Sequence, residues 1–176
     1  MWLYGRPAAG KSTLAQGLEQ RLHADGFVVR RLESDEIRQG LSRNLGFDET
    51  DRAEHIRRLA ETARLFVDAG IVVVCAAITP FRSHRAMARS ILGSDLQLVY
   101  VASSFETCAG RDPKGLYRRA LRGEIVSFTG IDSPFEEPGN EGDLTIDTEG
   151  PSIGVSLENL AAAVVPNLTG GRRPPS

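Results

Sequence analysis

The chain has 176 residues, of which 41% are hydrophobic and 25% charged, and its formal net charge is −2 at pH 7. This balance is ordinary for one globular domain, and it provides no general attraction to nucleic acids or membrane surfaces. No apolar run approaches the roughly 20 residues of a membrane span, and the first residues read as a strand rather than a signal peptide. The two cysteines, Cys75 and Cys108, are too few for a disulfide framework, so we expect buried thiols in a reducing cytoplasm.

The chain opens with a strand, a glycine-bounded loop and a helix. Residues 2–4 (Trp-Leu-Tyr) predict a short buried strand, and residues 5–13 (Gly-Arg-Pro-Ala-Ala-Gly-Lys-Ser-Thr) match the pattern G-x-x-x-x-G-K-[ST] in full. The apolar residues at 14, 18 and 22 that follow have helical spacing. In this context the loop predicts a phosphate-binding site, whereas a chance run of Gly, Ala and Pro would lack both flanking elements.

The chemistry of a bound triphosphate accounts for the residue types in this loop. Backbone N–H groups at a helix N-terminus surround the phosphates, and Gly5 and Gly10 allow a tight turn. Lys11 can reach the β- and γ-phosphates, and the Ser12 hydroxyl can bind Mg²⁺, whereas Pro7 lacks an N–H group to contribute. The predicted ATP-binding residues of this segment are Gly5, Arg6, Pro7, Ala8, Ala9, Gly10, Lys11, Ser12 and Thr13.

Carboxylates follow the second predicted strand. Residues 27–32 read as that strand, and Glu-Ser-Asp-Glu follows at 33–36. The carboxyl ends of parallel strands line the ligand crevice of an open α/β sheet, so Asp35 is expected near the phosphates in a catalytic role. Alternatively, Ser34 or Asp35 caps a short helix through Arg38. The two interpretations are compatible.

The next helix is expected to begin after a loop at 40–47, to be capped by Asp48 or Thr50, and to run to about Asp68. Its apolar face consists of Ile56, Leu59, Ala63 and Phe66 or Val67, and most of its charges read as a solvated face with pairs such as Glu54–Arg58. An unpaired Arg52 in the first turn would oppose the helix dipole, so it is predicted to serve an anionic partner. His55 reads as a surface or packing residue.

The rest of the chain continues to alternate strands and helices. Strands are predicted at 71–78, 96–101 and 144–146. A helix is predicted at 83–92, and a short one is capped by Ser103 or Ser104 and ends at 108. The last predicted helix begins at Ser152 or Ser156 and ends at about 165. The basic segment 110–119 predicts a lid that neutralises transferring phosphate; a nucleic-acid patch is the alternative, but interleaved aromatics are lacking. The fold class is therefore α/β, a three-layer P-loop NTPase fold with a mainly parallel five-stranded sheet. It forms one domain over 1–166, and a disordered tail is expected at 167–176.

From Arg38 to Thr148 the sequence resembles the adenylylsulfate kinases, P-loop enzymes that use MgATP to phosphorylate the 3′-hydroxyl of adenosine 5′-phosphosulfate. The resemblance rests on Asn-Leu-Gly-Phe at 44–47, Asp-Pro-Lys-Gly-Leu-Tyr at 112–117 and Phe-Thr-Gly-Ile-Asp at 128–132, among other stretches. The last two runs are specific to the family, whereas the P-loop alone is not. The resemblance implies transfer to adenosine 5′-phosphosulfate in sulfate assimilation, by a cytoplasmic homodimer that binds small nucleotides.

The resemblance also implies residue roles. Lys11 and Asp35 are the expected catalytic residues, and Ser12 and Asp35 the expected metal ligands. Phe47 and Phe128 match aromatics that sandwich the substrate adenine, and Arg111 matches a residue near the ATP base. The remaining expected substrate-binding residues are Arg38 and Arg52, which match arginines that hold the phosphosulfate, the lid lysine Lys114, and His55, Ile78, Thr79 and Leu116.

Several positions depart from the family pattern. Glu-Ser-Asp-Glu at 33–36 stands where Asp-Gly-Asp-Asn is usual, and His55 stands where a substrate-contacting Asn is usual. Ala77 replaces a common Phe, and Thr79 replaces a Ser. These departures leave the acceptor open: a kinase of a related nucleotide such as cytidine diphosphoramidate is the alternative. A non-catalytic nucleotide-binding relative is a second alternative, whereas a GTPase is disfavoured because Asn-Lys-x-Asp is absent.

Overall fold

The computed structural model describes residues 1–139 and 144–168. Its strands are β1 (Trp2–Tyr4), β2 (Val29–Glu33), β3 (Val72–Ala76), β4 (Leu98–Ala102) and β5 (Leu144–Asp147). Its α-helices are α1 (Lys11–Ala24), α2 (Ser34–Gln39), α3 (Glu49–Asp68), α4 (Arg82–Leu92), α5 (Phe105–Arg111), α6 (Leu116–Leu121) and α7 (Ile153–Val164), and two 3₁₀ turns are η1 (Gly93–Asp95) and η2 (Val165–Asn167).

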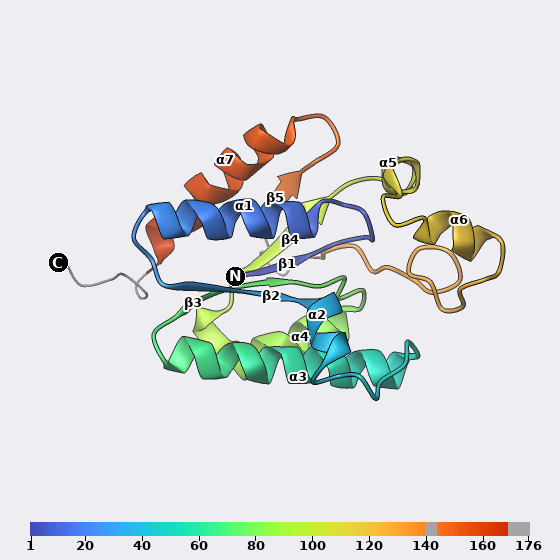
Figure 1. Cartoon of the computed structure of the whole chain (residues 1–176), viewed down its shortest axis with the longest axis horizontal. Helices are drawn as coiled ribbons and strands as arrows, with labels where there is room; N and C mark the ends of the chain where they lie inside the picture. Colours follow the sequence, from blue (N-terminus) through green and yellow to red (C-terminus); the bar gives the residue numbers. More distant parts are fainter. Residues whose placement is uncertain (140–143, 169–176) are drawn as a thin grey trace.

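The five strands form one sheet in the order β2-β3-β1-β4-β5, and all four pairings are parallel. Helices α1 and α7 cover one face, and α3 and α4 cover the other (Figure 1). Helices α5 and α6 lie beyond the carboxyl ends of the strands, on the side where the loop after β1 also lies. The predicted three-layer α/β fold with a parallel sheet is therefore confirmed.

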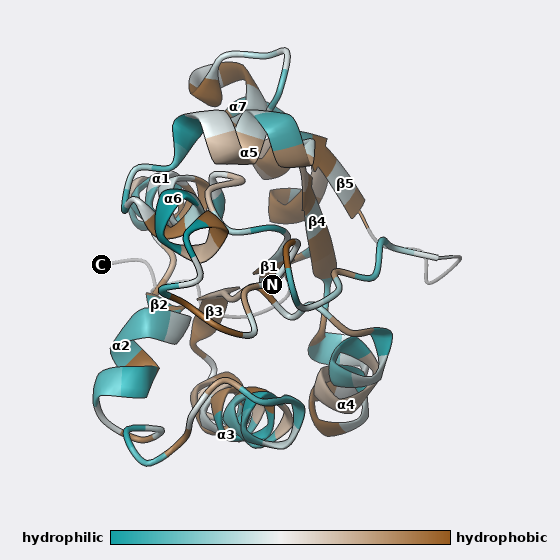
Figure 2. Ribbon diagram, turned by 90° about the vertical axis from the view of Figure 1, so that its right-hand side faces the viewer, coloured by the Kyte–Doolittle hydropathy of each residue, from teal (hydrophilic) through white to brown (hydrophobic). Residues whose placement is uncertain are grey.

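The core lies on both faces of the sheet because successive side chains of a strand point in opposite directions. Leu3 packs with residues of α1 and α7 such as Leu18 and Leu160, whereas Trp2 and Tyr4 pack on the α3 side. All three β1 side chains are fully buried. In Figure 2 the strands are mostly brown, whereas α2, at the edge of the molecule, is mostly teal. Cys75 and Cys108 are buried free thiols, as predicted.

Local capping signals predicted three helix starts correctly. Asp48 accepts a hydrogen bond from the Asp51 N–H at 2.8 Å, and Ser104 and Ser152 accept from the third residue of α5 and α7. The predicted capping of the short helix by Ser34 or Asp35 is wrong. Glu33 is its N-cap residue and makes no side-chain cap bond, because Ser34 and Asp35 bond to side chains from other elements.

Strand boundaries differ from prediction by about two residues. The predicted strand 27–32 runs from Val29 to Glu33, because the Phe27 N–H bonds back to the Leu22 carbonyl at the end of α1. The predicted strand 96–101 begins at Leu98, because the Leu96 N–H donates to the Gly93 carbonyl of η1. In the described residues we find no helix that combines the length and apolarity needed to cross a bilayer. Most of the predicted tail, 169–176, lies outside the described residues.

Candidate active site

The loop after β1 adopts the conformation that the P-loop pattern predicts. Gly5 has φ of 153° and Gly10 has φ of 96°, values that residues with a Cβ rarely adopt. A Cβ at Gly5 would lie 2.6 Å from the Val101 carbonyl oxygen, so β4 leaves room only for glycine. Helix α1 begins at Lys11 with no side-chain cap. Its first N–H groups therefore remain available for an anion.

Lys11 is held inside this loop. Its Nζ donates to the carbonyl oxygens of Gly5 at 3.0 Å and Arg6 at 2.7 Å, and its side chain is 9% exposed. Burial lowers the pKa of Lys11 to about 8, although the carboxylates of Asp35 and Glu33 act to raise it. A polyanion bound in the loop would favour the charged form in the same way.

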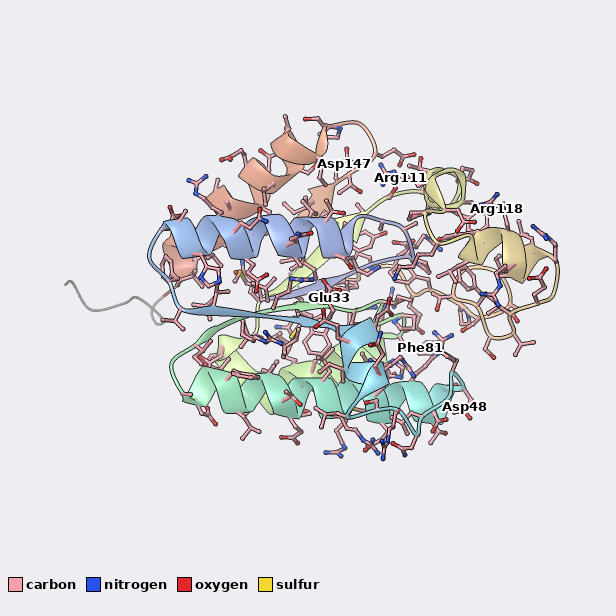
Figure 3. The ribbon with its side chains drawn as sticks, viewed as in Figure 1. Glu33, Asp48, Phe81, Arg111, Arg118 and Asp147 are labelled. Carbon is pink, nitrogen blue, oxygen red and sulfur yellow. The ribbon has the colours of Figure 1, made fainter. Side chains whose placement is uncertain are left out.

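Glu33 is a site residue that sequence reasoning missed. At the end of β2 (Figure 3) its Oε2 accepts from the Ser12 hydroxyl at 2.9 Å, and its Oε1 accepts from Arg31 at 2.6 Å. Arg31 also binds Glu19 of α1 at 3.0 Å, so the carboxylate is fixed from two sides. The signal was present in the carboxylate segment 33–36, but sequence alone favoured Asp35.

The oxygen set around Ser12 fits a hard divalent cation. A hydroxyl and a carboxylate oxygen are ligands that Mg²⁺ accepts, and Mg²⁺ commonly completes its shell with phosphate oxygens and water. Within residues 1–139 and 144–168, no cluster of three or more His, Cys, Asp or Glu could hold a metal without such additions. The site therefore fits a metal that arrives with a nucleotide.

Asp35 and Lys114 lie opposite each other at the cavity. Lys114, in the turn between α5 and α6, forms an ion pair with the Asp35 carboxylate at the start of α2, and the two side chains are 65% and 70% exposed. Helix α6 is itself anchored, since the buried Tyr117 hydroxyl donates to the Pro7 carbonyl at 3.0 Å. The predicted basic lid thus contacts both the phosphate loop and the expected catalytic carboxylate.

Two arginines face the cavity from the other side. Arg38 donates to the Gly46 carbonyl at 2.9 Å and lies 4.4 Å from the centre of the Phe47 ring. Arg52, predicted to serve an anionic partner, donates within the chain to the Phe47 carbonyl at 2.6 Å, to the Thr129 hydroxyl at 2.7 Å and to the Ser127 carbonyl. These acceptors are neutral, and burial lowers the pKa of both guanidinium groups. Because these acceptors carry no charge, neither hydrogen-bond set neutralises its guanidinium group, which leaves both arginines suited to an anion.

His55 is buried rather than on the surface. It is 2% exposed, its Nε2 lies 2.8 Å from the Ser34 hydroxyl, and its Nδ1 has no hydrogen-bond partner among the described residues. Burial lowers the pKa of His55 to about 4, so the ring is neutral at pH 7. Two positions that depart from the family pattern, Ser34 and His55, are thus in direct contact at the cavity wall.

These elements surround one cavity of about 580 Å³. Most of the predicted site residues line it: Pro7, Ala8, Gly10, Lys11, Ser12, Thr13, Asp35, Arg38, Phe47, Arg52, His55, Ile78, Thr79, Arg111, Lys114 and Leu116. Residues that sequence reasoning did not select also line it, including Glu33, Tyr117, Thr148, Pro151 and Ile153. Thr148 joins β5 to the P-loop, because its hydroxyl donates to the Ala9 carbonyl at 2.9 Å.

Four predicted site residues do not line this cavity: Gly5, Arg6, Ala9 and Phe128. Phe128 is 7% exposed and packs edge-on against Tyr117 with ring centres 5.0 Å apart, whereas Phe47 is 59% exposed. The predicted pair of stacking rings is therefore not formed around the cavity. Arg111, labelled in Figure 3, donates to the Thr148 carbonyl, just after the end of β5.

Comparison with known proteins agrees with this geometry. The family model described as adenylylsulphate kinase matches residues 1–147. The chain belongs to the adenylylsulphate kinase family. The adenylyl-sulfate kinase of Bacteroides thetaiotaomicron is 46% identical over 169 residues, which are 96% of this chain and 84% of that protein. The adenylyl-sulfate kinase of Clostridium acetobutylicum is 45% identical over 84% of this chain and 74% of its own length.

Solved structures of adenylylsulphate kinases show the same fold. The Mycobacterium tuberculosis APS kinase CysC in complex with AMPPNP and APS is 38% identical, with a TM-score of 0.89 over 93% of this chain and 95% of that one. The hexameric APS kinase from Thiobacillus denitrificans has a TM-score of 0.70 at 26% identity, over 94% of this chain and 28% of that one. The resemblance and the fold predicted from the sequence are confirmed, and the chain is a kinase-type phosphotransferase.

Proposed function

We propose that this chain transfers the γ-phosphoryl group of ATP to the 3′-hydroxyl of adenosine 5′-phosphosulfate, yielding ADP and 3′-phosphoadenosine 5′-phosphosulfate. The observation that carries this proposal is the cavity that joins Lys11 and Ser12 of the P-loop to Asp35, Arg38 and Arg52. A phosphate donor held by the first pair would lie beside an anionic acceptor held by the arginines. The structure of a 38% identical relative with AMPPNP and APS supports the same pairing of substrates.

The donor side is formed by the P-loop and the segment after β5. ATP phosphates would bind to the N–H groups at the start of α1 and to Lys11. Arg111, which donates to the Thr148 carbonyl, would contact the base. A nucleotide held in this way presents its γ-phosphoryl group toward α2, where Asp35 lies.

The acceptor side is formed by α2, the start of α3 and the loop after β3. Arg38 and Arg52 would neutralise the phosphosulfate, and the exposed Phe47 ring would stack on the adenine. His55, Ile78 and Thr79 would line the remaining surface. The 3′-hydroxyl oxygen attacks the γ-phosphorus, the bond from that phosphorus to the β,γ-bridging oxygen breaks, and Asp35 accepts the hydroxyl proton.

Positioning and charge neutralisation supply most of the rate enhancement in such a transfer. Lys114 would release Asp35 and bind the transferring phosphoryl group when nucleotides enter. Ser12, Glu33 and Asp35 would hold Mg²⁺, which neutralises the β- and γ-phosphates when bound. We propose Mg²⁺ because the donors are hydroxyl and carboxylate oxygens.

One experiment tests the acceptor. The protein is incubated with MgATP and a panel of adenosine 5′-phosphosulfate, cytidine diphosphoramidate and ordinary nucleoside diphosphates, and products are identified by mass. We expect a gain of one phosphoryl group on adenosine 5′-phosphosulfate alone, and its loss in a Lys11→Ala variant. Transfer to the cytidine compound alone would replace the proposed acceptor, and ATP binding without transfer would indicate a non-catalytic relative.

We further propose that residues 1–166 act as one domain and that the enzyme is a cytoplasmic homodimer. A homodimer would have twice the 19.1 kDa mass of the chain. Sedimentation of the purified chain would measure this mass, and cell fractionation would test the compartment.

A further inference from the structure

Arg6 belongs to the P-loop, yet its side chain does not line the cavity. It extends to residues 135–137, a segment that we call the strap. Its Nη2 donates to Glu137 Oε1 at 2.7 Å, and its guanidinium carbon lies 5.0 Å from the centre of the Phe135 ring. With 17% of its side chain exposed, Arg6 is largely enclosed by these partners.

The strap is fixed to the sheet independently of Arg6. The second carboxylate oxygen of Glu137 accepts from the hydroxyl of Tyr100 in β4. Burial, followed by this hydrogen bond, raises the pKa of the Tyr100 phenol, so the phenol remains a donor. The Glu136 N–H donates to the Pro80 carbonyl at 2.9 Å, and the Glu137 carbonyl accepts from Arg82 at 3.2 Å. Glu137 therefore stands at a position set by β4 and the loop after β3.

The backbone of Arg6 is bound to Lys11. Its carbonyl oxygen accepts from Lys11 Nζ at 2.7 Å and from the Ala9 N–H at 3.2 Å. The side chain of Arg6 is thus bound by the strap, and its carbonyl oxygen binds the phosphate-binding lysine. A displaced Arg6 would move an acceptor of Lys11 and one end of the tight turn.

The strap also continues from the loop that contacts Arg52. Arg52 donates to Thr129, and a Cβ at Gly130 would lie 3.3 Å from Arg6 Nη1. Arg6 consequently lies where the phosphate loop meets the loop that supports the acceptor-side arginine.

We propose that Glu137 and Arg6 form a positioning pair that fixes the P-loop carbonyls around Lys11 and so sets the affinity for ATP and the rate of transfer. This inference rests on the proposed function for its rate effect, whereas its effect on ATP affinity does not. Arg6 is 17% exposed but Glu137 is 50% exposed, and ion pairs with such access to solvent contribute only modestly to stability. The pair should therefore affect ligand binding more than folding.

The test compares Arg6→Ala, Glu137→Ala, the double variant and Arg6→Lys. We expect each alanine variant to bind MgATP about tenfold more weakly by calorimetry, a size typical of losing a charged hydrogen bond. The double variant should be no weaker than the poorer single one, because both changes remove one interaction. Arg6→Lys should recover part of the affinity.

Kinetics add a second measurement. We expect kcat to fall in the alanine variants while KM for the acceptor stays within about twofold of wild type. The matched control is Glu158→Gln, which removes an Arg21–Glu158 ion pair of 3.4 Å between α1 and α7, away from the cavity. It should leave ATP affinity and kcat unchanged.

The proposal would be contradicted if both alanine variants kept the ATP affinity of wild type. It would also be contradicted if the double variant lost as much binding free energy as the two single variants together. A merely structural role would lower the melting temperature and leave ATP affinity per folded molecule unchanged, which also counts against the proposal. A wild-type protein that binds ATP but transfers no phosphoryl group would contradict the proposed function. The affinity measurements would then still decide the role of Arg6 and Glu137.

Discussion

The Ser12 hydroxyl donates to the Glu33 carboxylate over 2.9 Å and thereby joins the first turn of α1 to the last residue of β2. The two residues are in contact in the fold but 21 positions apart in the chain. The contact places a carboxylate beside the hydroxyl that would bind the nucleotide's metal ion. Because Arg31 holds the other carboxylate oxygen, Glu33 is preorganised for this role.

Glu33→Gln should therefore weaken metal use. Residues that orient or complete a metal site typically affect affinity or activity by about 10–100-fold, and we expect the Mg²⁺ concentration for half-maximal rate to rise within that range. A magnesium titration of the phosphotransfer rate measures it. Glu36→Gln, an exposed carboxylate of the same segment, is the control and should match wild type. If both variants needed the same Mg²⁺ concentration for half-maximal rate, Glu33 would have no role in metal binding.

Asp35→Asn should lower turnover by about 10²-fold or more, since the amide cannot accept the hydroxyl proton. The ion pair with Lys114 is exposed at both ends, so its loss should change the free energy of unfolding by less than about 1 kcal/mol. Single-turnover kinetics and urea unfolding measure the two quantities. Full turnover in Asp35→Asn would refute the catalytic role.

Asp48→Ala should destabilise the protein by about 1 kcal/mol, because the Asp51 N–H loses its capping acceptor. Thr50→Ala is the matched control: Thr50 was the alternative cap, and it lies inside α3 instead. Its replacement should change stability by less than about 0.5 kcal/mol. Urea denaturation at pH 7 compares the two, and equal losses would contradict the assignment of the cap.

Acid should destabilise the fold partly through His55. Its pKa is lowered by burial from 6.5 in the unfolded chain to about 4, so protons bind preferentially to the unfolded chain between these values. This contribution to stability is intact above pH 6.5 and falls as the pH drops toward 4, by about 3 kcal/mol at most.

The His55→Asn variant should lose less stability than wild type between pH 7.5 and 4.5. Burial also lowers the pKa of His84, so part of the acid sensitivity should persist in the variant. The exposed His23→Asn variant should follow wild type. Identical urea midpoints for His55→Asn and wild type at both pH values would show that His55 is not protonated on unfolding.

Features that depend on neighbours in the chain were predictable. Glycine at 5 and 10, the lysine and serine that follow, and the caps Asp48, Ser104 and Ser152 act over a few residues, so their spacing carries the information. The alternation of apolar strands with amphipathic helices likewise predicted the parallel sheet. These local rules were sufficient for the fold class and for the phosphate site.

Features that depend on distant partners were not predictable. Arg52 was expected to serve an anionic partner, but the sequence did not show that it also donates to Thr129, 77 positions away. Phe128 was expected to face the adenine, but it packs on Tyr117 in the core. Ser34 was considered as a helix cap, but its hydroxyl forms a hydrogen bond with Nε2 of His55 instead. In each case the side chain has several possible partners in the fold, and spacing along the chain does not indicate which one it contacts.

The sequence alone thus determined that a phosphate loop follows the first strand and that a carboxylate segment follows the second, because backbone geometry and capping are short-range effects. Only the tertiary structure decided that Glu33 binds Ser12 while Asp35 pairs with Lys114, and that Arg6 turns away from the cavity to Glu137. The physical reason is that parallel pairing brings strand ends from distant positions to one edge of the sheet. Which side chains meet there depends on packing among elements that no local pattern describes.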